Sequence, residues 1–406
     1  MTDALSAGVH AVLDRRLAAV SGAPLAVGLS GGGDSRALAL IAADWAAAHG
    51  RRLLVLTIDH GLNPASAAWT AQCAALAARL GAPFHALAWT GDKPARGLPA
   101  AARLARHRLL AEAARGLGAR VVLLGHTASD LAEAAAMRAE GSTTPSPREW
   151  APSPVWPEGR GVFLLRPMLG VTRQALRDWL AARGEAWIDD PSNDDLRFAR
   201  ARARAARPEP TPAADLPQDL AGLAAAAQVD AAGVVALPRA RLPARLTAAA
   251  ALCAAGTARP PRADRLARVT TLLQAGRPLV ATLAGARIET DGERVLFMRE
   301  PGEFARRPEA ALMLAPGQSA VWDGRFEITA ARAAVVAPLA GHAARLPPAQ
   351  RQALRAIAPK ARAALPVLLD GAAAHCPLLE DVAGVAIRSL ILDRLLAACG
   401  AVEREP

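Results

Sequence analysis

The sequence is poor in several kinds of residue, and each shortage argues against a class of protein. Its 406 residues include no tyrosine and only six phenylalanines, which argues against an RNA-binding platform that stacks bases on aromatic rings. None of the four cysteines belongs to a Cys-x-x-Cys pair, so neither a zinc knuckle nor an iron–sulfur site is indicated. No apolar run reaches the roughly 18 residues of a membrane span, and the N-terminus lacks the basic start and cleavage site of a signal peptide. We therefore expect a cytoplasmic protein without a membrane partner.

Lysine is scarce as well, so the positive charge comes almost entirely from arginine. Lys93 and Lys360 are the only lysines, yet the formal net charge is +11. A basic excess of this size favours a polyanionic partner such as a nucleic acid. The richness in alanine, arginine and proline can also reflect genomic base composition, so charge alone leaves the partner open.

Apolar runs and helical segments alternate through the first half of the chain. A strand is expected around Val27, and further strands at 52–59, 84–89, 120–125 and 162–165. This spacing is typical of βαβ units and predicts a doubly wound parallel sheet of the α/β class, with ligands bound beyond the carboxyl ends of the strands. Helices are expected at 1–20, 35–48, 64–80, 99–116, 129–139 and 172–183.

The second half of the chain differs in composition and predicts smaller domains. Residues 207–217 are rich in proline and read as a linker, and residues 218–275 show helical patterns. Two strands joined at Asp291-Gly292 are expected within 278–299, and further strand-like pieces flank Asp323-Gly324. Helices are expected at 347–357 and 387–399. The predicted division is an α/β domain at 1–206, a helical domain with a hairpin at 207–308 and a small α+β domain at 309–406.

The stretch from Leu25 to Leu40 organises the first domain. An apolar strand is followed by Ser-Gly-Gly-Gly-Asp-Ser and at once by a helical segment, whose N-terminus offers N–H groups to a phosphate. It matches neither a Walker A loop nor a GxGxxG turn, but it resembles the SGGxDS pyrophosphate loop of the N-type ATP pyrophosphatases. An ordinary glycine-rich turn is the alternative. The candidate ATP-binding residues are Ser30, Gly31, Gly32, Gly33, Asp34 and Ser35, and Asp34 is also the candidate Mg²⁺ ligand.

Polar residues follow the next two strand regions. Asp59 and His60 end the second strand, where they would contact nucleotide or metal, or where Asp59 would only cap a turn. Arg103 and Arg106 lie three residues apart and share a helix face. They would bind a phosphate or carboxylate, or they form an ordinary solvated face.

A carboxylate pair follows the fourth strand. His126 ends that strand, and Asp130 and Glu133 face the same way on the next helix. The pair would hold Mg²⁺ or an amine substrate, or it only complements the helix dipole. His126 is a further candidate contact for ATP.

Two later segments are basic or irregular. Arg197, Arg200 and Arg204 fall on one helical face, which suits a nucleic-acid backbone or a salt-bridged helix. Residues 141–161 are rich in proline, serine and glycine without a period, and read as a loop that is either a lid over the site or a connector.

Taken together, these motifs resemble the tRNA(Ile)-lysidine synthetase family. The segment 190–204, which carries the three arginines named above, is the most discriminating of these motifs. Other pyrophosphate-loop enzymes share the loop at 30–35 but lack this basic segment. Four positions depart from the family's usual residues: Ser129 replaces an aspartate, Ala134 a threonine, Ala201 an asparagine and His107 a tyrosine. The matching segments are 30–35, 59–62, 102–106, 125–133, 166–169 and 190–204, followed by 260–262 and 282–299.

The resemblance implies an adenine nucleotide alpha hydrolase-like, Rossmann-like catalytic domain followed by two tRNA-binding domains. It implies that ATP, with Mg²⁺, adenylates the wobble cytidine of tRNA(Ile) with anticodon CAU, and that free L-lysine then displaces AMP to give lysidine. In that scheme Asp34, Arg103, Arg106, Asp130 and Glu133 are catalytic, and Arg197, Arg200 and Arg204 grip the tRNA. The oligomeric state stays open, with a dimer as one option.

Three rival functions remain. A tRNA thiolase would use the same loop, but it commonly needs a reactive cysteine pair, and Cys73 is the only cysteine of the first domain. A catalytically inactive RNA- or nucleotide-binding protein is the second rival, motivated by Ser129 and Ala134. A small-molecule amidotransferase is the third, and it leaves the basic tail unexplained.

Overall fold

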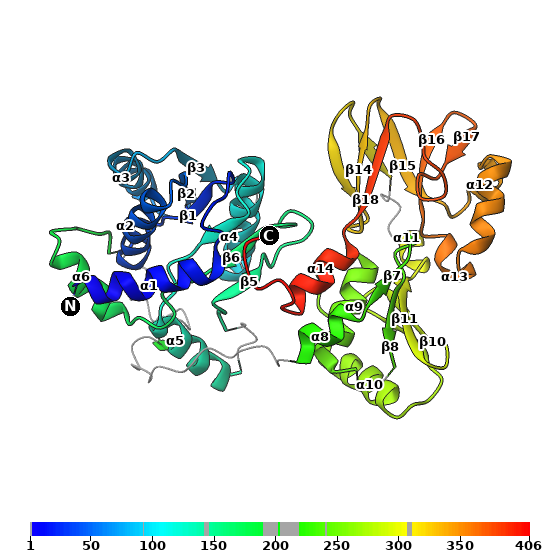
Figure 1. Ribbon diagram of the computed structural model, residues 1–406, viewed down its shortest axis with the longest axis horizontal. Helices are drawn as coiled ribbons and strands as arrows, with labels where there is room; N and C mark the ends of the chain where they lie inside the picture. Colours follow the sequence, from blue (N-terminus) through cyan, green and yellow to red (C-terminus); the bar gives the residue numbers. More distant parts are fainter. Residues whose placement is uncertain are drawn as a thin grey trace. The chain divides into compact units, whose positions relative to one another are not determined.

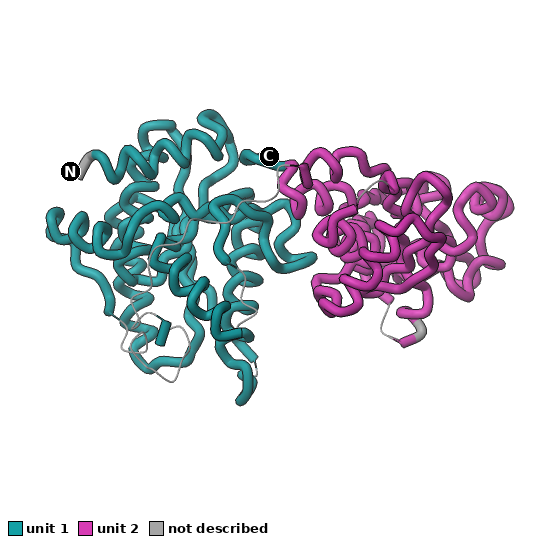
Figure 2. Tube along the Cα trace, turned by 90° about the horizontal axis from the view of Figure 1, so that it is seen from below, with its two compact units in different colours: residues 1–215, 402–406 teal, residues 216–401 magenta. Residues whose placement is uncertain are grey.

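The chain folds into two compact units, each of which is described by itself (Figure 2). The first comprises residues 1–215 together with 402–406, and the second comprises residues 216–401. In this computed structural model the described residues are 2–91, 93–141, 146–189, 202–203, 219–239, 242–306 and 311–406.

The first unit is built on a six-stranded sheet in the order β3-β2-β1-β4-β6-β5 (Figure 1). All neighbouring strands are parallel except β5, which pairs antiparallel with β6 at the edge. The predicted parallel α/β fold is therefore confirmed. The strands are β1 (Leu25–Gly28), β2 (Leu53–Asp59), β3 (Phe84–Ala88), β4 (Val121–Leu123), β5 (Trp150–Pro152) and β6 (Phe163–Leu165).

Both faces of this sheet are covered. Leu25 and Val27 of β1 lie in a core cluster that they share with α1, α2, α3 and α6. Ala26, between them, belongs to a second cluster that includes Leu110 of α4, because successive strand residues point to opposite faces. The helices of this unit are α1 (Thr2–Arg16), α2 (Gly33–Ala48), α3 (Ser66–Arg79), α4 (Leu98–Gly116), α5 (Ala128–Ala139) and α6 (Arg173–Ala181).

Two features of the first unit differ from the sequence-based expectation. The predicted irregular loop 141–161 contains β5, where the Trp150 ring stacks on Phe163 with centroids 4.9 Å apart. Residues 402–406 return to this unit rather than to the C-terminal domain predicted at 309–406. Glu405 there forms a buried ion pair with Arg51. No pattern of neighbouring residues predicts either feature, because both depend on contacts with residues that are distant in the sequence.

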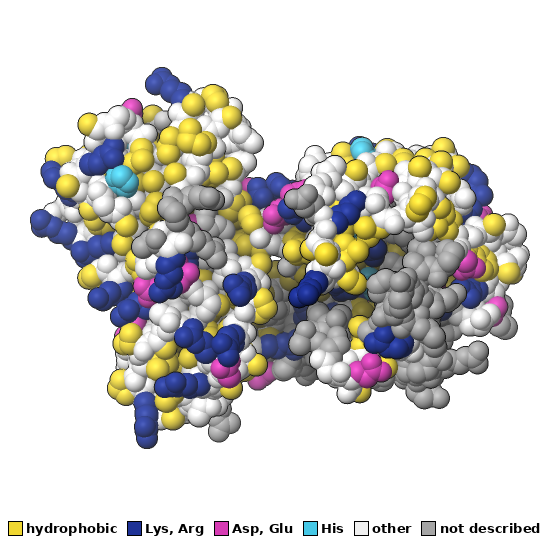
Figure 3. Space-filling model, turned by 180° about the vertical axis from the view of Figure 1, so that it is seen from behind, with side chains coloured by type: hydrophobic (Ala, Val, Ile, Leu, Met, Phe, Trp, Pro, Cys, Tyr) yellow, Lys and Arg dark blue, Asp and Glu magenta, His cyan; other side chains and the backbone are white. Residues whose placement is uncertain are grey.

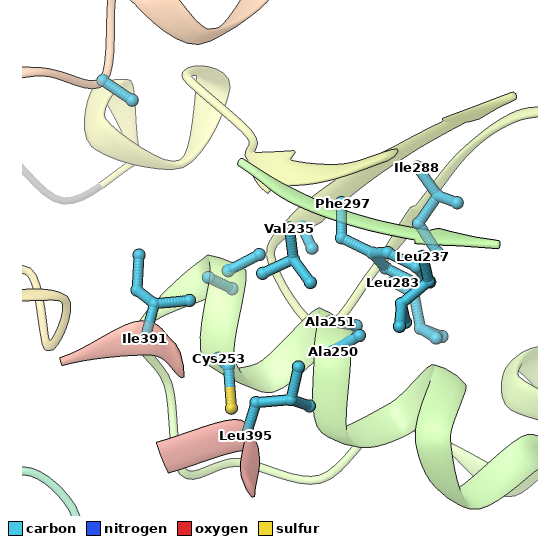
Figure 4. Close-up of a cluster of buried hydrophobic side chains, with 14 of the residues drawn as sticks. Val235, Leu237, Ala250, Ala251, Cys253, Leu283, Ile288, Phe297, Ile391 and Leu395 are labelled. Carbon is cyan, nitrogen blue, oxygen red and sulfur yellow. The ribbon is translucent and has the colours of Figure 1, made fainter. Parts of the chain in front are cut away.

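The second unit begins with helices packed on a five-stranded sheet in the order β7-β8-β11-β10-β9. Figure 4 shows Val235, Phe297 and Leu283 of this sheet packed over Ala250 and neighbouring residues of α9. The elements are α8 (Asp219–Ala225), β7 (Gln228–Val229), β8 (Val235–Pro238), α9 (Ala244–Ala255), α10 (Ala263–Gln274), β9 (Val280–Leu283), β10 (Ala286–Thr290), β11 (Arg294–Arg299) and α11 (Gly302–Ala305).

The rest of the second unit contains two small sheets, ordered β12-β15-β16-β17 and β13-β14-β18. No helix among the described residues of either unit is long and apolar enough to cross a membrane. The remaining elements are β12 (Leu312–Leu314), β13 (Ser319–Trp322), β14 (Phe326–Ala330), β15 (Ala334–Pro338), η2 (Ala343–Arg345), α12 (Pro348–Ala353), η3 (Leu354–Ala356), α13 (Pro359–Arg362), β16 (Pro366–Asp370), β17 (Ala373–His375), β18 (Val385–Ser389) and α14 (Ile391–Ala398).

Several details of the second unit correct the sequence analysis. The supposedly all-helical segment 218–275 contains β7 and β8, and the expected hairpin has a third strand, β9. A tight turn at Ala284-Gly285, where both residues have positive φ, joins β9 to β10. Helix α14 begins at Ile391 because residues 385–389 pair with β14. One hydrophobic core contains residues from both sides of position 308, for example Phe304 and Leu314. The domain boundary predicted at 308 from the sequence stays a prediction.

Candidate active site

A pocket of about 290 Å³ opens at the carboxyl ends of β1, β2 and β4 in the first unit. This is where a doubly wound sheet places its ligands. Ten residues predicted from the sequence line it: Ser30, Gly32, Gly33, Asp34, Ser35, His60, Arg103, Arg106, His126 and Asp130.

The Ser-Gly-Gly-Gly-Asp-Ser loop forms the floor of the pocket. Helix α2 begins at Gly33, and the N-cap Gly32 supplies no side-chain hydrogen bond to the helix N-terminus. Ser35 Oγ donates to Gly32 O at 3.0 Å and accepts from Ser30 N at 3.1 Å, which ties the two ends of the loop together. The result is a rigid turn at a helix N-terminus, which is suited to binding phosphate.

Gly31 is required by the close approach of a second segment. Its φ is +86°, and a Cβ there would lie 2.3 Å from Ile188 Cδ1. The backbone N–H of Ile188 donates to Gly31 O at 3.0 Å. Glu185 anchors the same segment through ion pairs to Arg36 at 2.7 Å and Arg79 at 2.6 Å. Residues 185–189 therefore brace the loop from one side.

The acidic wall of the pocket comes from the start of α5. Asp130 Oδ2 accepts from the backbone N–H of Thr127 at 2.7 Å and from its hydroxyl at 2.9 Å, which completes a capping box. Asp130 and Glu133 are only 5 % and 2 % exposed. Asp130 therefore lies where it complements the N-terminus of α5, the alternative given for it from the sequence, and its capping contacts also fix the direction of the other carboxylate oxygen, Oδ1.

Arg173, the first residue of α6, joins the acidic wall to the loop. Its guanidinium forms ion pairs with Asp34 at 3.0 Å, with Glu133 at 2.9 Å and with Asp130 at 3.4 Å. Burial opposes its charged form, but the three carboxylates raise the pKa of Arg173 above its usual value. Three candidate residues that lie far apart in the sequence are thereby held in one cluster.

The opposite wall, formed by α4, is basic. Arg106 donates to His60 Nε2 at 3.3 Å, and burial together with Arg106 lowers the pKa of His60 to about 4. Burial, with help from Arg103, Arg166 and Arg106, lowers the pKa of His107 to about 3. Burial and the nearby Arg103 and Arg148 lower the pKa of Arg166 to about 10. Burial is the largest cause of these shifts, and the contributions of several arginines show that positive charges lie close together here, which suits a phosphate or a carboxylate.

The remaining predicted site residues are placed differently. Asp59 Oδ1 accepts from the backbone N–H of Gly61 at 2.7 Å, as the turn-capping alternative predicted. Gly31, Asp59 and Glu133 are not among the residues that line the pocket, although Glu133 reaches it through Arg173. Arg197, Arg200 and Arg204 lie outside the described residues.

No site role was predicted from the sequence for four residues that line the pocket: Arg173, His107, Arg177 and Asp189. A signal for Arg173 was present, because a cation at the first position of a helix opposes the helix dipole and therefore needs another reason to be there. His107 lies one position after Arg106 on the same helix, and it was noted from the sequence only as a departure from the family's usual tyrosine.

Two further side-chain arrangements bear on rival chemistries. Within the described ranges, no group of three or more His, Cys, Asp or Glu residues is arranged to hold a metal ion by itself. Cys73 is 2 % exposed in the core of the first unit, and burial raises the pKa of its thiol. A buried thiol of this kind is a poor source of the thiolate that thiolation chemistry needs.

Comparisons with known proteins identify the family of the chain. The PP-loop domain family matches residues 7–207. The tRNA(Ile)-lysidine synthase of Caulobacter vibrioides is 54% identical over 405 residues, covering 98% of each chain. The enzyme of that name from Mesorhizobium japonicum is 36% identical, covering 78% of this chain and 75% of its own.

Among solved structures, a U34-tRNA thiolase from Methanococcus maripaludis matches with a TM-score of 0.42 and 14% identity, covering 50% of this chain and 71% of its own. The family is shown by the identity to the Caulobacter protein over the full length, and the structural likeness is not used to assign it. The chain belongs to the tRNA(Ile)-lysidine synthase family.

Proposed function

We propose that the protein ligates L-lysine to carbon 2 of the wobble cytidine of tRNA(Ile) with anticodon CAU, forming lysidine and releasing AMP and pyrophosphate from ATP. Family membership supports the reaction. The single observation that carries the proposal is the linkage of the phosphate loop to Asp130 and Glu133 through Arg173, because it joins a leaving-group site to an amine site.

In the first step, cytosine O2 attacks the α-phosphorus of ATP and the bond to pyrophosphate breaks. The loop from Ser30 to Ser35 would hold the pyrophosphate with backbone N–H groups and hydroxyls. A carboxylate oxygen of Asp34 suits Mg²⁺, which prefers one or two carboxylates plus phosphate oxygens. When bound, the ion would neutralise charge that builds up on the leaving group. Asp59, His60 and His126 are proposed contacts for the nucleotide.

In the second step, the ε-amine of lysine attacks carbon 2, and the bond from carbon 2 to the adenylate oxygen breaks to release AMP. The attacking amine must be neutral, so its proton passes to a base. Asp130 and Glu133 are proposed to bind and orient the lysine amine. Arg103 and Arg106 on the basic wall are proposed to bind the adenylate phosphate or the lysine carboxylate.

The tRNA is proposed to contact both units. Lys and Arg side chains are more frequent than Asp and Glu on the face drawn in Figure 3, which suits a polyanion. Arg197, Arg200 and Arg204 are proposed to grip the backbone, and the second unit to bind elsewhere on the tRNA. The cytoplasmic location and the option of a dimer stay predictions.

The test incubates the purified protein with ATP, Mg²⁺, labelled lysine and total bacterial tRNA, and counts acid-precipitable label that survives mild alkali. Alkali removes aminoacyl esters but spares lysine attached to a base. We expect stable label from the unmutated protein, and a loss of about 10³-fold in Asp34→Asn with nearly unchanged tRNA affinity. Asp44→Asn, an exposed change on the same helix, is the matched control.

The alternatives give different results. Intact ATP binding with no AMP formation would favour a binding protein. ATP cleavage that does not depend on tRNA would favour an amidotransferase acting on a small molecule. Incorporation of sulfur rather than lysine would favour thiolation, against the burial of Cys73.

A further inference from the structure

We propose that Arg173 is a positioning residue that assembles the lysine site before lysine arrives. It holds the carboxylates of Asp34, Asp130 and Glu133 in one cluster, so that the amine of lysine meets a preformed anionic surface beside the phosphate loop. This inference rests on the proposed function and assigns a role to a residue outside the motifs that suggested it.

The geometry gives each guanidinium nitrogen a different partner. Nε donates to Asp34 Oδ2 at 3.0 Å, Nη1 to Glu133 Oε1 at 2.9 Å and Nη2 to Asp130 Oδ1 at 3.4 Å. One side chain thus spans the N-terminal turns of α2 and α5. A lysine ammonium is a compact charge and could not span the three carboxylates in the same planar arrangement.

The low exposure of the cluster makes the carboxylates depend on Arg173. The side chains of Arg173, Asp34, Asp130 and Glu133 are only 17%, 21%, 5% and 3% exposed, so their charges are weakly screened. Without Arg173, three carboxylates would repel one another, and the cluster would open or take up protons. With Arg173 in place, its guanidinium holds the three carboxylates together at the edge of the pocket, where their oxygens are proposed to accept hydrogen bonds from the amine of the substrate.

Two hydrogen bonds hold the backbone at the start of α6, and they fix the point from which the Arg173 side chain extends. Its N–H donates to Ser129 Oγ at 3.3 Å, and the Thr172 hydroxyl caps α6 by accepting from Ala175 N at 3.3 Å. Ser129 is a position where this chain departs from the family's usual aspartate. Here its hydroxyl fastens the arginine-bearing helix to the acidic helix.

The test compares Arg173→Gln and Arg173→Lys with the unmutated protein. We expect Arg173→Gln to weaken lysine binding by about 10- to 100-fold in calorimetry and to raise the KM for lysine similarly. The KM for ATP should change by less than about 3-fold, because the loop keeps its own hydrogen bonds. Arg173→Lys should recover part of the lysine affinity. Arg183→Gln, just beyond the end of α6, is the matched control for loss of an exposed arginine.

Chemical rescue separates positioning from a general structural role. Added guanidinium ion at low concentration should lower the lysine KM of Arg173→Gly but not that of the unmutated protein. Unchanged or tighter lysine binding in Arg173→Gln would overturn the proposal, because it would mean that Arg173 is neutral or competes with lysine. An equal loss of ATP and lysine affinity would also overturn it. Failure of the unmutated protein to form alkali-stable label would instead overturn the proposed function.

Discussion

Two clusters in the first unit each join an arginine to carboxylate side chains, and they differ in the number of carboxylates that the arginine meets. Arg51 pairs with Glu405 through two hydrogen bonds of 2.6 and 2.8 Å, and both side chains are at most 2% exposed. The Arg51 guanidinium also donates to the carbonyls of Ala18 and Ala23. Arg173 instead meets three carboxylates beside an open pocket.

The difference indicates what each cluster does. At Arg51, one charge meets one charge inside the protein, and backbone carbonyls accept further guanidinium N–H groups, so the pair fastens residues 402–406 to the first unit. At Arg173 one guanidinium meets three carboxylates at the edge of a pocket. Perturbed and unbalanced charges are typical of functional sites, whereas matched buried pairs are typical of structural ones. The predictions below test this distinction.

The largest expected effect is on stability, at the Arg51 cluster. Glu405→Ala leaves the buried Arg51 without its counter-charge, and we expect a loss of about 3–5 kcal/mol in the unfolding free energy of the first unit. Lysine transfer per folded molecule should not change. Urea unfolding monitored by proteolysis of the first unit measures the effect, with Glu403→Ala on the exposed neighbouring side chain as control.

A double variant tests whether charge or packing matters at this cluster. Arg51→Met combined with Glu405→Leu removes both charges and should recover much of the lost stability, since apolar replacements of buried pairs are often tolerated. If Glu405→Ala leaves the unfolding free energy unchanged, this ion pair does not hold residues 402–406 to the first unit, and the distinction between the two clusters fails.

The second effect is on activity, at the Arg173 cluster. Glu133→Gln removes one of three mutually repelling carboxylates, so the thermal midpoint of the first unit should stay the same or rise. We expect lysine transfer to fall by about 10²-fold, because the amine loses a charged partner. Glu140→Gln, at the exposed end of α5, is the control. If Glu133→Gln lowers the thermal midpoint but leaves lysine transfer unchanged, the Arg173 cluster is structural, like the Arg51 cluster.

Local patterns in the sequence predicted the frame of the site. The βαβ rhythm placed the five parallel strands of the sheet to within a few residues, and the glycine-rich turn after Leu29 lies at a helix N-terminus as predicted, while its binding of phosphate stays a prediction. Asp130 and Glu133 were predicted on one helix face and lie there. Each of these inferences depends on residues that are neighbours in the chain.

Contacts between distant residues could not be predicted in the same way. Arg51 and Glu405 are 354 residues apart, and Arg173 is 139 residues from Asp34. Short strands such as β5 and β7 carry too few residues to show alternation, and their pairing depends on a partner strand. The carboxylate partners of the two arginines therefore come together only when the chain is folded.

The smallest effect concerns the basic wall, where positive charges lie close together. His107 is 6 % exposed, and burial and the neighbouring arginines lower its pKa to about 3, so it stays neutral in the folded protein. In the unfolded chain a histidine takes up a proton near its usual pKa of about 6.5. Between these values the unfolded state binds more protons, so stability must fall as the pH falls.

His107→Gln should remove this contribution and flatten the pH dependence of unfolding of the first unit by up to about 1.4 kcal/mol per pH unit between pH 6 and pH 4. Urea midpoints at several pH values measure the slope, and His375→Gln in the second unit controls for the loss of a histidine. A slope that His107→Gln leaves unchanged would mean that the pKa of His107 is not lowered in the folded protein, and that burial does not keep its imidazole neutral. Water would then reach the basic wall more freely than the structure indicates, and a screened wall is a poorer candidate for binding an anionic substrate.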